Sequence, residues 1–355
     1  MRRKKLIASL LIAAMTTTML AGCGAKQPSG DAGDTSDTPK QEQPATTGLY
    51  PGTPDENAIT VNISTEPPNL FSVKSTDTTS SDVLRHVLET LVQLDANDQV
   101  IPGVAKEWTV SDDGLTYNFK LRDDMKWSNG EPVTAHDFVF AWTSLLSPDF
   151  ASEYAYFGYV FKNGLAFSEG KVGADELGFK AVSDYELEVT LENPTSYFLG
   201  SLAYKSFAPL NEKAYKEFGE AYGTDADKMV YNGPYKIASW EHENKIVLEK
   251  NPDYYDADNV ELEKINMVMI NDSNAAMNAF KAGELDMAGL NGEQLKMMET
   301  ENYPFYTYED GSNFYMEYNL SNKYLANKNL RQAITYAIDK QAYVDNIVKN
   351  SSKPA

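Results

Sequence analysis

The sequence contains very little cysteine and histidine. Its 355 residues include one cysteine, Cys23, and three histidines, His86, His136 and His242. A single cysteine excludes an intramolecular disulfide. The three histidines are far apart and form no H-E-x-x-H pattern, so we expect surface or capping histidines rather than ligands of a zinc ion. The sequence predicts no metal site.

Motifs for catalysis are also absent. There is no G-x-S-x-G, and no thiol is available for nucleophilic work apart from Cys23. The stretch 164–171, GLAFSEGK, only superficially resembles a phosphate-binding loop, because its glycines are one residue too far apart and Val172 replaces the required Ser or Thr. Two Asp-x-Asp pairs lack the glycine and glutamate of a calcium loop. We therefore predict a protein that is not an enzyme and needs no cofactor.

Positive charge is scarce. The chain has 31 Lys and Arg against 52 Asp and Glu, for a net charge of −21. Nucleic acids and anionic surfaces need a basic footprint, so this balance argues against both as partners. With 42% hydrophobic residues the chain is rich enough to fold, and its length favours two or more domains.

The first 22 residues differ from the rest of the chain. Arg2 to Lys5 are basic, Leu6 to Met19 are mainly apolar but interrupted by threonines, and Leu20-Ala21-Gly22 precede Cys23. The apolar part is too short for a confident membrane span and is typical of a signal peptide. The L-A-G-C ending resembles a bacterial lipobox, which implies that Cys23 is lipid-modified and becomes the mature N-terminus. More than one acyl chain would hold the protein stably on a membrane.

Large apolar side chains are missing from residues 24–48, which contain no Val, Ile, Leu, Met or aromatic residue. Such a segment cannot bury enough apolar surface to fold, so we expect a disordered tether.

The most informative stretch is 115–142. Leu115, Tyr117, Phe119 and Leu121 alternate with polar residues, which predicts a strand with one buried face. The sequence SNGEP (128–132) predicts a turn. Thr134 and Asp137, three residues apart, approximate a capping box that opens a helix. The pattern K-W-S-N-G-x-P-x-T-A-x-D-F at 126–138 closely resembles the family 5 extracellular solute-binding proteins, the oligopeptide-binding receptors of ABC importers.

Other segments extend this resemblance over most of 58–349. The family's G-P-Y-x-x-x-x-W segment is matched at 233–240, its G-E-x-D segment at 283–286, where we expect a short strand over 284–287, and its helix pair at 329–348. The resemblance implies an α/β, bilobal periplasmic-binding-protein-like fold of type II. Family members are longer, so we expect this chain to be the N-terminal part, with a C-terminal portion missing. It also implies the following division: a signal peptide at 1–22, a lipidated cysteine and tether at 23–57, domain I at 58–80 and 200–312, domain II at 81–199, and the start of a second ligand-binding lobe at 313–355.

The residues at 72–82 are rich in small hydroxyl side chains, and Ser80 or Ser81 is expected to cap the following helix. An ordinary loop would explain this composition. The resemblance favours another interpretation, because in these receptors the backbone before this helix pairs with the ligand. A strand is also expected over 313–319, and its alternate residues Tyr315, Glu317 and Asn319 share one face. By the resemblance, the candidate ligand-binding residues are Thr76, Asp77, Thr78, Tyr154, Tyr315, Glu317 and Asn319.

The resemblance therefore implies a monomeric, lipid-anchored receptor on the extracytoplasmic face of the cell membrane that captures oligopeptides for an ABC transporter permease. Relatives of the same fold also carry dipeptides, metal chelates, sugars or signalling peptides, so these ligands stay open. A surface enzyme or foldase on the same scaffold is the alternative from another class, and the missing catalytic motifs argue against it.

Overall fold

The computed structural model describes residues 57–308, 311–350 and 352–354. Its first sheet has the strand order β1-β10-β9-β8, with β1 at Ala58–Asn62, β8 at Tyr235–Glu241, β9 at Lys245–Lys250 and β10 at Lys264–Val268. Strands β1 and β10 are parallel, although about 200 residues separate them in sequence, and the other pairs are antiparallel. Strands β8 and β9 form an antiparallel hairpin.

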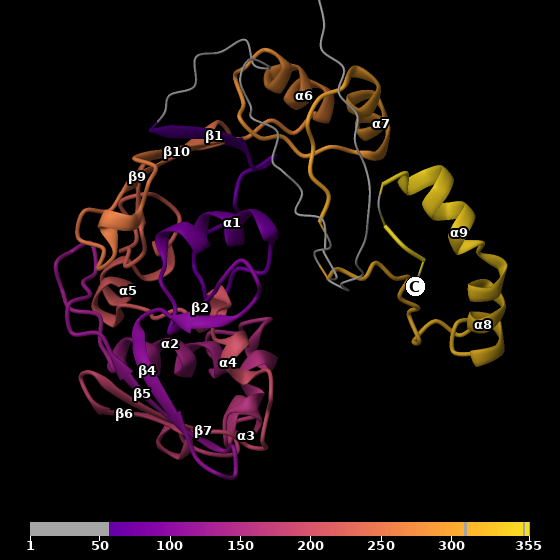
Figure 1. The fold of residues 1–355 in the computed structure, drawn as a ribbon. Coiled ribbons are helices and arrows are strands. Elements are labelled where there is room, and N and C mark those ends of the chain that lie inside the picture. The colour runs from indigo at the N-terminus through magenta and orange to yellow at the C-terminus, as the bar shows by residue number, and fades with distance from the viewer. Residues whose placement is uncertain (1–56, 309–310, 351, 355) are drawn as a thin grey trace, which may run out of the picture. The chain divides into compact units, whose positions relative to one another are not determined.

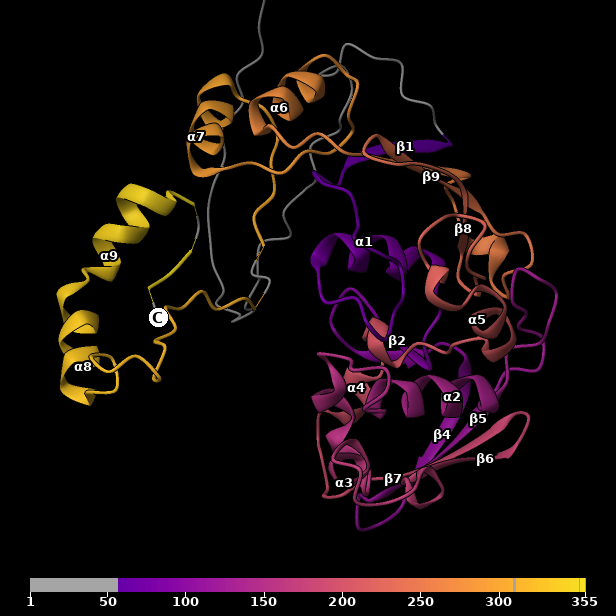
Figure 2. The ribbon, with the colours of Figure 1, turned by 180° about the vertical axis from the view of Figure 1, so that it is seen from behind.

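The second sheet is antiparallel throughout, in the order β4-β5-β7-β6. Its strands are β4 (Ala105–Val110), β5 (Thr116–Leu121), β6 (Phe179–Ser183) and β7 (Glu186–Thr190). Helix α2 (Ala135–Leu146) lies along this sheet in both views (Figures 1 and 2). Trp142 on α2 stacks on Phe161 at 4.9 Å between ring centroids, and its indole donates to the Phe207 carbonyl at 3.0 Å.

The central stretch folds as predicted. In β5, Tyr117, Phe119 and Leu121 are buried and the residues between them are exposed. The following turn contains Gly130 at a φ of +86°, a conformation that glycine adopts without a steric penalty. At the beginning of α2, the Asp137 carboxylate accepts hydrogen bonds from the Thr134 N–H at 2.7 Å and from its hydroxyl at 3.0 Å, so the expected capping box is present.

Helix α1 (Thr78–Val87) begins earlier than expected. Its N-cap is Asp77, whose carboxylate accepts from the Ser80 N–H at 2.6 Å, so the prediction of a cap at Ser80 or Ser81 is wrong. Asp, Ser and Thr are all competent N-caps, and Asp77 lies inside an uninterrupted run of them from Ser75 to Asp82, so the run alone did not fix the position of the cap. The helix is followed by a two-stranded sheet of β2 (Val92–Leu94) and β3 (Val100–Pro102).

The short helix α6 (Ser273–Lys281) ends before Gly283, whose φ of +77° is typical of a C′ glycine. The strand predicted over 284–287 is reduced to a single bridge between Met287 and Val61. The reason is that the Asp286 carboxylate, rather than another backbone carbonyl, accepts from the Thr60 N–H at 2.7 Å, so the ladder does not continue.

The strand predicted over 313–319 is also wrong, because no described strand pairs with these residues. The predicted helix pair after them is present, and Asp339 caps the second helix at the Ala342 N–H, 2.9 Å away. No helix in the described ranges has both the length and the apolar character of a membrane span.

The remaining helical elements are α3 (Gly164–Ser168), α4 (Phe198–Ser201), α5 (Glu212–Phe218), α7 (Gly292–Glu301), α8 (Lys328–Ala337), α9 (Lys340–Tyr343), the 3-10 turns Ala155–Val160, Ala174–Glu176, Lys205–Phe207, Gly219–Ala221 and Ala257–Asn259, and the π-turn Val344–Val348.

Candidate functional site

Two of the predicted ligand-binding segments contact each other. The Tyr154 hydroxyl donates a hydrogen bond to the Thr76 carbonyl at 2.9 Å, across 78 residues of sequence. Tyr154 is half-buried, and Thr76 and Thr78 are exposed. The structure therefore brings the segment before α1 and the tyrosine-rich segment after α2 together at one place on the surface.

Asp77 has a structural part in this segment. Its carboxylate caps α1, and its carbonyl accepts from the Ser81 hydroxyl at 2.7 Å and from the Ser81 N–H at 3.3 Å. Because the side chain and the carbonyl are both engaged within the first turn of the helix, Asp77 offers a ligand its backbone N–H more readily than its carboxylate.

Hydrogen-bond donors are left free along this segment. Among the described residues, the backbone N–H groups of Thr76, Asp77 and Thr78 have no acceptor. The carbonyls of Thr76 and Asp77, by contrast, already accept side-chain hydroxyls. Consecutive free N–H groups at the beginning of a helix suit carbonyl or carboxylate oxygens, which an extended peptide supplies along its main chain.

A lysine that the sequence did not predict lies beneath this segment. Lys205 is 7% exposed, and its ammonium donates to the Ser75 carbonyl and, at 2.8 Å, to the Ser75 hydroxyl. Burial lowers the pKa of Lys205 to about 8, and the nearby Asp77 carboxylate opposes part of that shift. The signal in the sequence is that Lys205 is the one charged residue in 199–210.

Aromatic rings surround the ammonium and extend outward from it. The Lys205 nitrogen lies 5.5 Å from the ring centroid of Tyr154 and 5.6 Å from that of Tyr204, distances at which a cation is attracted to an aromatic face. Tyr154 also packs edge to face on Phe157 and Tyr156. Tyr156 is 53% exposed and Tyr204 is 36% exposed, so this aromatic group reaches the surface. Burial raises the pKa of Tyr204 to about 12.

The other three predicted ligand residues are not part of this arrangement. Tyr315 is 77% exposed, Glu317 and Asn319 are also exposed, and no contact among the described residues joins any of them to Tyr154 or Thr76. Asn319 has a local role, since its side chain accepts from the Ser321 N–H at 3.0 Å and so forms a turn. The part of these three residues in ligand binding stays a prediction.

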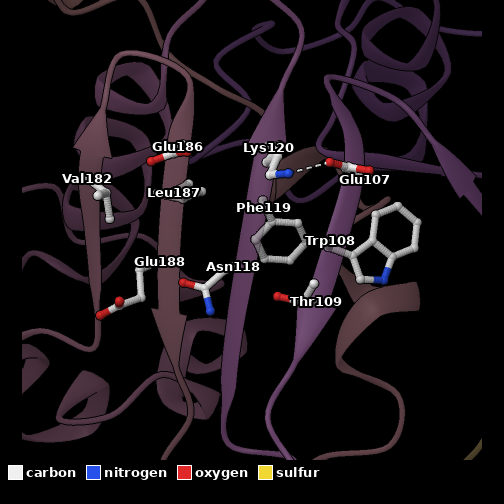
Figure 3. Close-up of a pocket in the computed structure, with 10 residues that line it drawn as sticks. All are labelled: Glu107, Trp108, Thr109, Asn118, Phe119, Lys120, Val182, Glu186, Leu187 and Glu188. Carbon is white, nitrogen blue, oxygen red and sulfur yellow. Dashed lines mark hydrogen bonds and ion pairs between the residues drawn. The ribbon is translucent and has the colours of Figure 1, made fainter.

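A shallow hollow of about 370 Å³ lies on the exposed face of the β4-β5-β7-β6 sheet (Figure 3). Its charged residues form cross-strand pairs: Lys120 is opposite Glu107 and Glu186, and its nitrogen lies 2.7 Å from the Glu107 carboxylate. None of the predicted ligand residues lines it. Alternating charges of this kind are typical of the solvent-facing side of an antiparallel sheet, so the hollow is a weaker candidate than the Tyr154 site.

The three histidines do not converge. His242 lies 2.7 Å from Glu66 and 2.9 Å from Asp225, and these carboxylates raise its pKa. His136 is paired with Asp184 at 3.4 Å. In the part of the chain that the structure describes, no three His, Cys, Asp or Glu side chains form an arrangement that could hold a metal ion.

Comparisons with known proteins agree with the resemblance seen in the sequence. The family model described as bacterial extracellular solute-binding proteins, family 5 Middle, matches residues 99–355. The oligopeptide-binding protein OppA of Bacillus subtilis is 37% identical to this chain, and the dipeptide-binding protein DppE of the same organism is 32% identical. Both alignments include 100% of this chain and 63% of the relative, so the chain spans less than two thirds of the length of these curated relatives.

Solved structures give the same result. The substrate-binding domain of an oligopeptide ABC transporter from Bacillus anthracis superposes with a TM-score of 0.74 at 36% identity, over 85% of this chain and 59% of that one. Listeria monocytogenes OppA bound to peptide gives a TM-score of 0.75 at 35% identity, over 85% and 60% of the two chains. The predicted α/β binding-protein fold is confirmed. This chain belongs to the family 5 bacterial extracellular solute-binding proteins.

Proposed function

We propose that the protein captures short peptides outside the cytoplasm and delivers them to the permease of an ABC transporter. The observation that carries this proposal is the row of free N–H groups at Thr76, Asp77 and Thr78 beside the exposed aromatic group of Tyr154. An extended peptide can place its carbonyls on alternate members of this row, the N–H groups of Thr76 and Thr78, in the manner of an added strand. The names of the relatives, oligopeptide-binding and dipeptide-binding proteins, support the same class of ligand.

Recognition through the main chain explains how one receptor accepts many sequences. The N–H groups of Thr76 and Thr78 bond to the ligand backbone, which is the same in every peptide, so they carry no information on side chains. Side chains of the ligand would lie near Tyr156 and Tyr204, whose rings pack against side chains of different shapes. Tyr315, Glu317 and Asn319 are proposed to contact the ligand from the opposite lobe once closure selects the liganded state.

The cellular part of the proposal rests on the N-terminal sequence. Residues 1–22 are proposed to be a signal peptide, Cys23 the lipid-modified anchor, and 24–57 the tether. Domain I is proposed at 58–80 and 200–312, which the parallel pairing of β1 with β10 supports. Domain II is proposed at 81–199, and 313–355 begins a second ligand-binding lobe. The receptor acts as a monomer without catalysis, cofactor or nucleic acid.

Dipeptides are the second candidate ligand, because DppE, a dipeptide-binding protein, aligns with the whole chain at 32% identity. A thermal-shift panel distinguishes the candidates. The full-length protein is heated with dialanine, trialanine, tetraalanine and the nonapeptide RPPGFSPFR, which was crystallised with Haemophilus influenzae OppA. A ligand at 100 times its Kd stabilises the folded state by about 2.7 kcal/mol, which raises the melting temperature by several degrees.

We expect a rise with the longer peptides and a smaller one with dialanine. Nickel and an oligosaccharide serve as controls and should leave the melting temperature unchanged. A panel in which no peptide raises the melting temperature, while nickel or the oligosaccharide does, would refute peptide capture.

A further inference from the structure

The segment before α1 is held from below by side chains that come from far away in sequence. The Val73 carbonyl accepts from the Ser152 hydroxyl at 2.5 Å, the Ser75 carbonyl accepts from the Lys205 ammonium, and the Thr76 carbonyl accepts from the Tyr154 hydroxyl at 2.9 Å. Each of these contacts occupies one lone pair of a carbonyl in the segment. The N–H groups of 76–78, by contrast, have no acceptor among the described residues and are free to donate to a ligand.

Lys205 is the charged member of these contacts, and it has no carboxylate partner in direct contact. No ion pair within 4.0 Å joins it to an acidic residue among the described residues, although it is 7% exposed. Burying an ammonium without an ion-pair partner is costly, so a site that keeps one must gain from it elsewhere. Its two hydrogen bonds among the described residues both go to Ser75, the residue directly before the free N–H row.

We propose that Lys205 is a positioning residue for ligand binding: by holding the Ser75 carbonyl and hydroxyl it fixes the backbone so that the N–H groups of Thr76 and Thr78 face the ligand. This inference rests on the proposed capture of peptides. The groups that face the ammonium are Ser75, the Asp77 carboxylate from the cap of α1, and the rings of Tyr154 and Tyr204.

Protonation of Lys205 gives a test that a purely structural lysine would not satisfy. Its pKa in the folded protein is about 8, below the ordinary value of 10.5, because burial disfavours the charge. Between about pH 8 and 10.5 the unfolded chain therefore holds the proton more often than the folded protein, and the contribution of Lys205 to stability rises with pH. The proposed role needs the charged form of Lys205, so the affinity for the ligand should fall as the pH rises over this range.

The experiment measures the Kd of the full-length protein for trialanine and RPPGFSPFR by calorimetry at pH 7, 8 and 9. In Lys205→Met, which keeps the apolar stem and removes the charge, we expect binding at pH 7 to weaken by roughly 10- to 100-fold. The wild type should weaken by up to about tenfold from pH 7 to 9, and Lys205→Met should lack this part of the dependence. The amino group of the peptide titrates equally in both comparisons, so the difference between variants isolates Lys205.

Two further variants complete the design. Lys205→Arg stays charged over the whole range, so it should bind at pH 7 within a few-fold of the wild type and lose the extra weakening at pH 9. It keeps the proposal testable if Lys205→Met does not fold. Lys216→Met, which removes an exposed lysine paired with Glu212, is the matched control and should bind and titrate like the wild type.

The outcomes separate the two proposals. If the wild type binds none of the peptides, peptide capture fails and the role of Lys205 falls with it. If the wild type binds, but Lys205→Met binds equally well or Lys205→Arg keeps the full pH dependence, peptide capture stands and the positioning role is overturned.

Discussion

The side chain of Asn232 holds both backbone groups of Glu89. Its Oδ1 accepts from the Glu89 N–H and its Nδ2 donates to the Glu89 carbonyl, each at 3.0 Å. Both residues are buried, at 1% and 3% exposure. Next to them the Gly233 N–H donates to the Val87 carbonyl at 3.0 Å, and a Cβ on Gly233 would lie 2.6 Å from the Val87 carbonyl carbon. The end of α1 is thus fixed to the turn before β8.

Replacing Asn232 should destabilise the protein strongly. In Asn232→Ala the Glu89 N–H and carbonyl lose their partners while buried, which costs roughly 2–4 kcal/mol in the free energy of unfolding. Urea unfolding followed by circular dichroism measures the loss. Asn259→Ala removes an exposed amide bonded only to Asp256 and should change stability by less than about 0.5 kcal/mol. Equal effects of the two substitutions would contradict the importance of the Asn232 contact.

Glu89 should make stability depend on pH. Burial raises the pKa of its carboxyl to about 7, against the partial opposing effect of hydrogen bonds from Tyr254 and Gln93 and the charge of Arg122. The folded protein therefore holds the proton more tightly than the unfolded chain, so this stabilising contribution is complete below about pH 4.5 and is lost as the pH rises through 7. The loss amounts to at most about 3 kcal/mol.

Glu89→Gln, which is neutral at every pH, isolates that contribution. Relative to this variant, the wild type should become less stable from pH 5 to pH 8, as measured by urea unfolding at both values. Glu153→Gln replaces an exposed glutamate and should keep the pH dependence of the wild type. A stability difference between wild type and Glu89→Gln that is the same at both pH values would show that Glu89 does not titrate in this range.

The elements that sequence reasoning predicted well are those whose information is local. The alternation at 115–121 and the Thr134–Asp137 spacing determine a strand and a helix start within a few residues, and both are present. The segment before α1 was harder, because every residue from Asp77 to Ser81 is a good N-cap. The hydrogen bond from the Ser80 N–H to the Asp77 carboxylate shows which of them is used.

The parts of the site that were missed depend on contacts between distant residues. Lys205 and Ser75 are 130 residues apart, and no periodicity in either segment indicates that they meet. Tyr154 and Thr76 were each predicted from a family resemblance as ligand contacts, which did not indicate that they bond to each other. The strand expected over 313–319 failed for a related reason: a strand exists only with a partner, and the described residues provide none.

The proposed lipid anchor can be tested by substituting Cys23, the one cysteine of the sequence, which lies outside the described residues. Cys23→Ala removes the one thiol available for acylation, so the protein should move from the membrane fraction to the aqueous phase in detergent partitioning of cell extracts. Gly24→Ala keeps the thiol and should stay with the detergent. A Cys23→Ala protein that still partitions with lipid would refute the anchor.

The hydroxyl and the ring of Tyr154 should contribute separately to peptide binding. Tyr154→Phe removes only the hydrogen bond to the Thr76 carbonyl, so it should weaken binding of trialanine by roughly 2- to 10-fold. Tyr154→Ala also removes a ring that packs on Phe157 and should weaken binding by roughly 5- to 150-fold. Calorimetry measures both, with Tyr159→Phe, which loses a hydroxyl next to Ser168, as the control expected to bind like the wild type. Unchanged affinity in Tyr154→Ala together with a melting temperature several degrees lower would make Tyr154 a packing residue, and the ligand site would have to lie elsewhere.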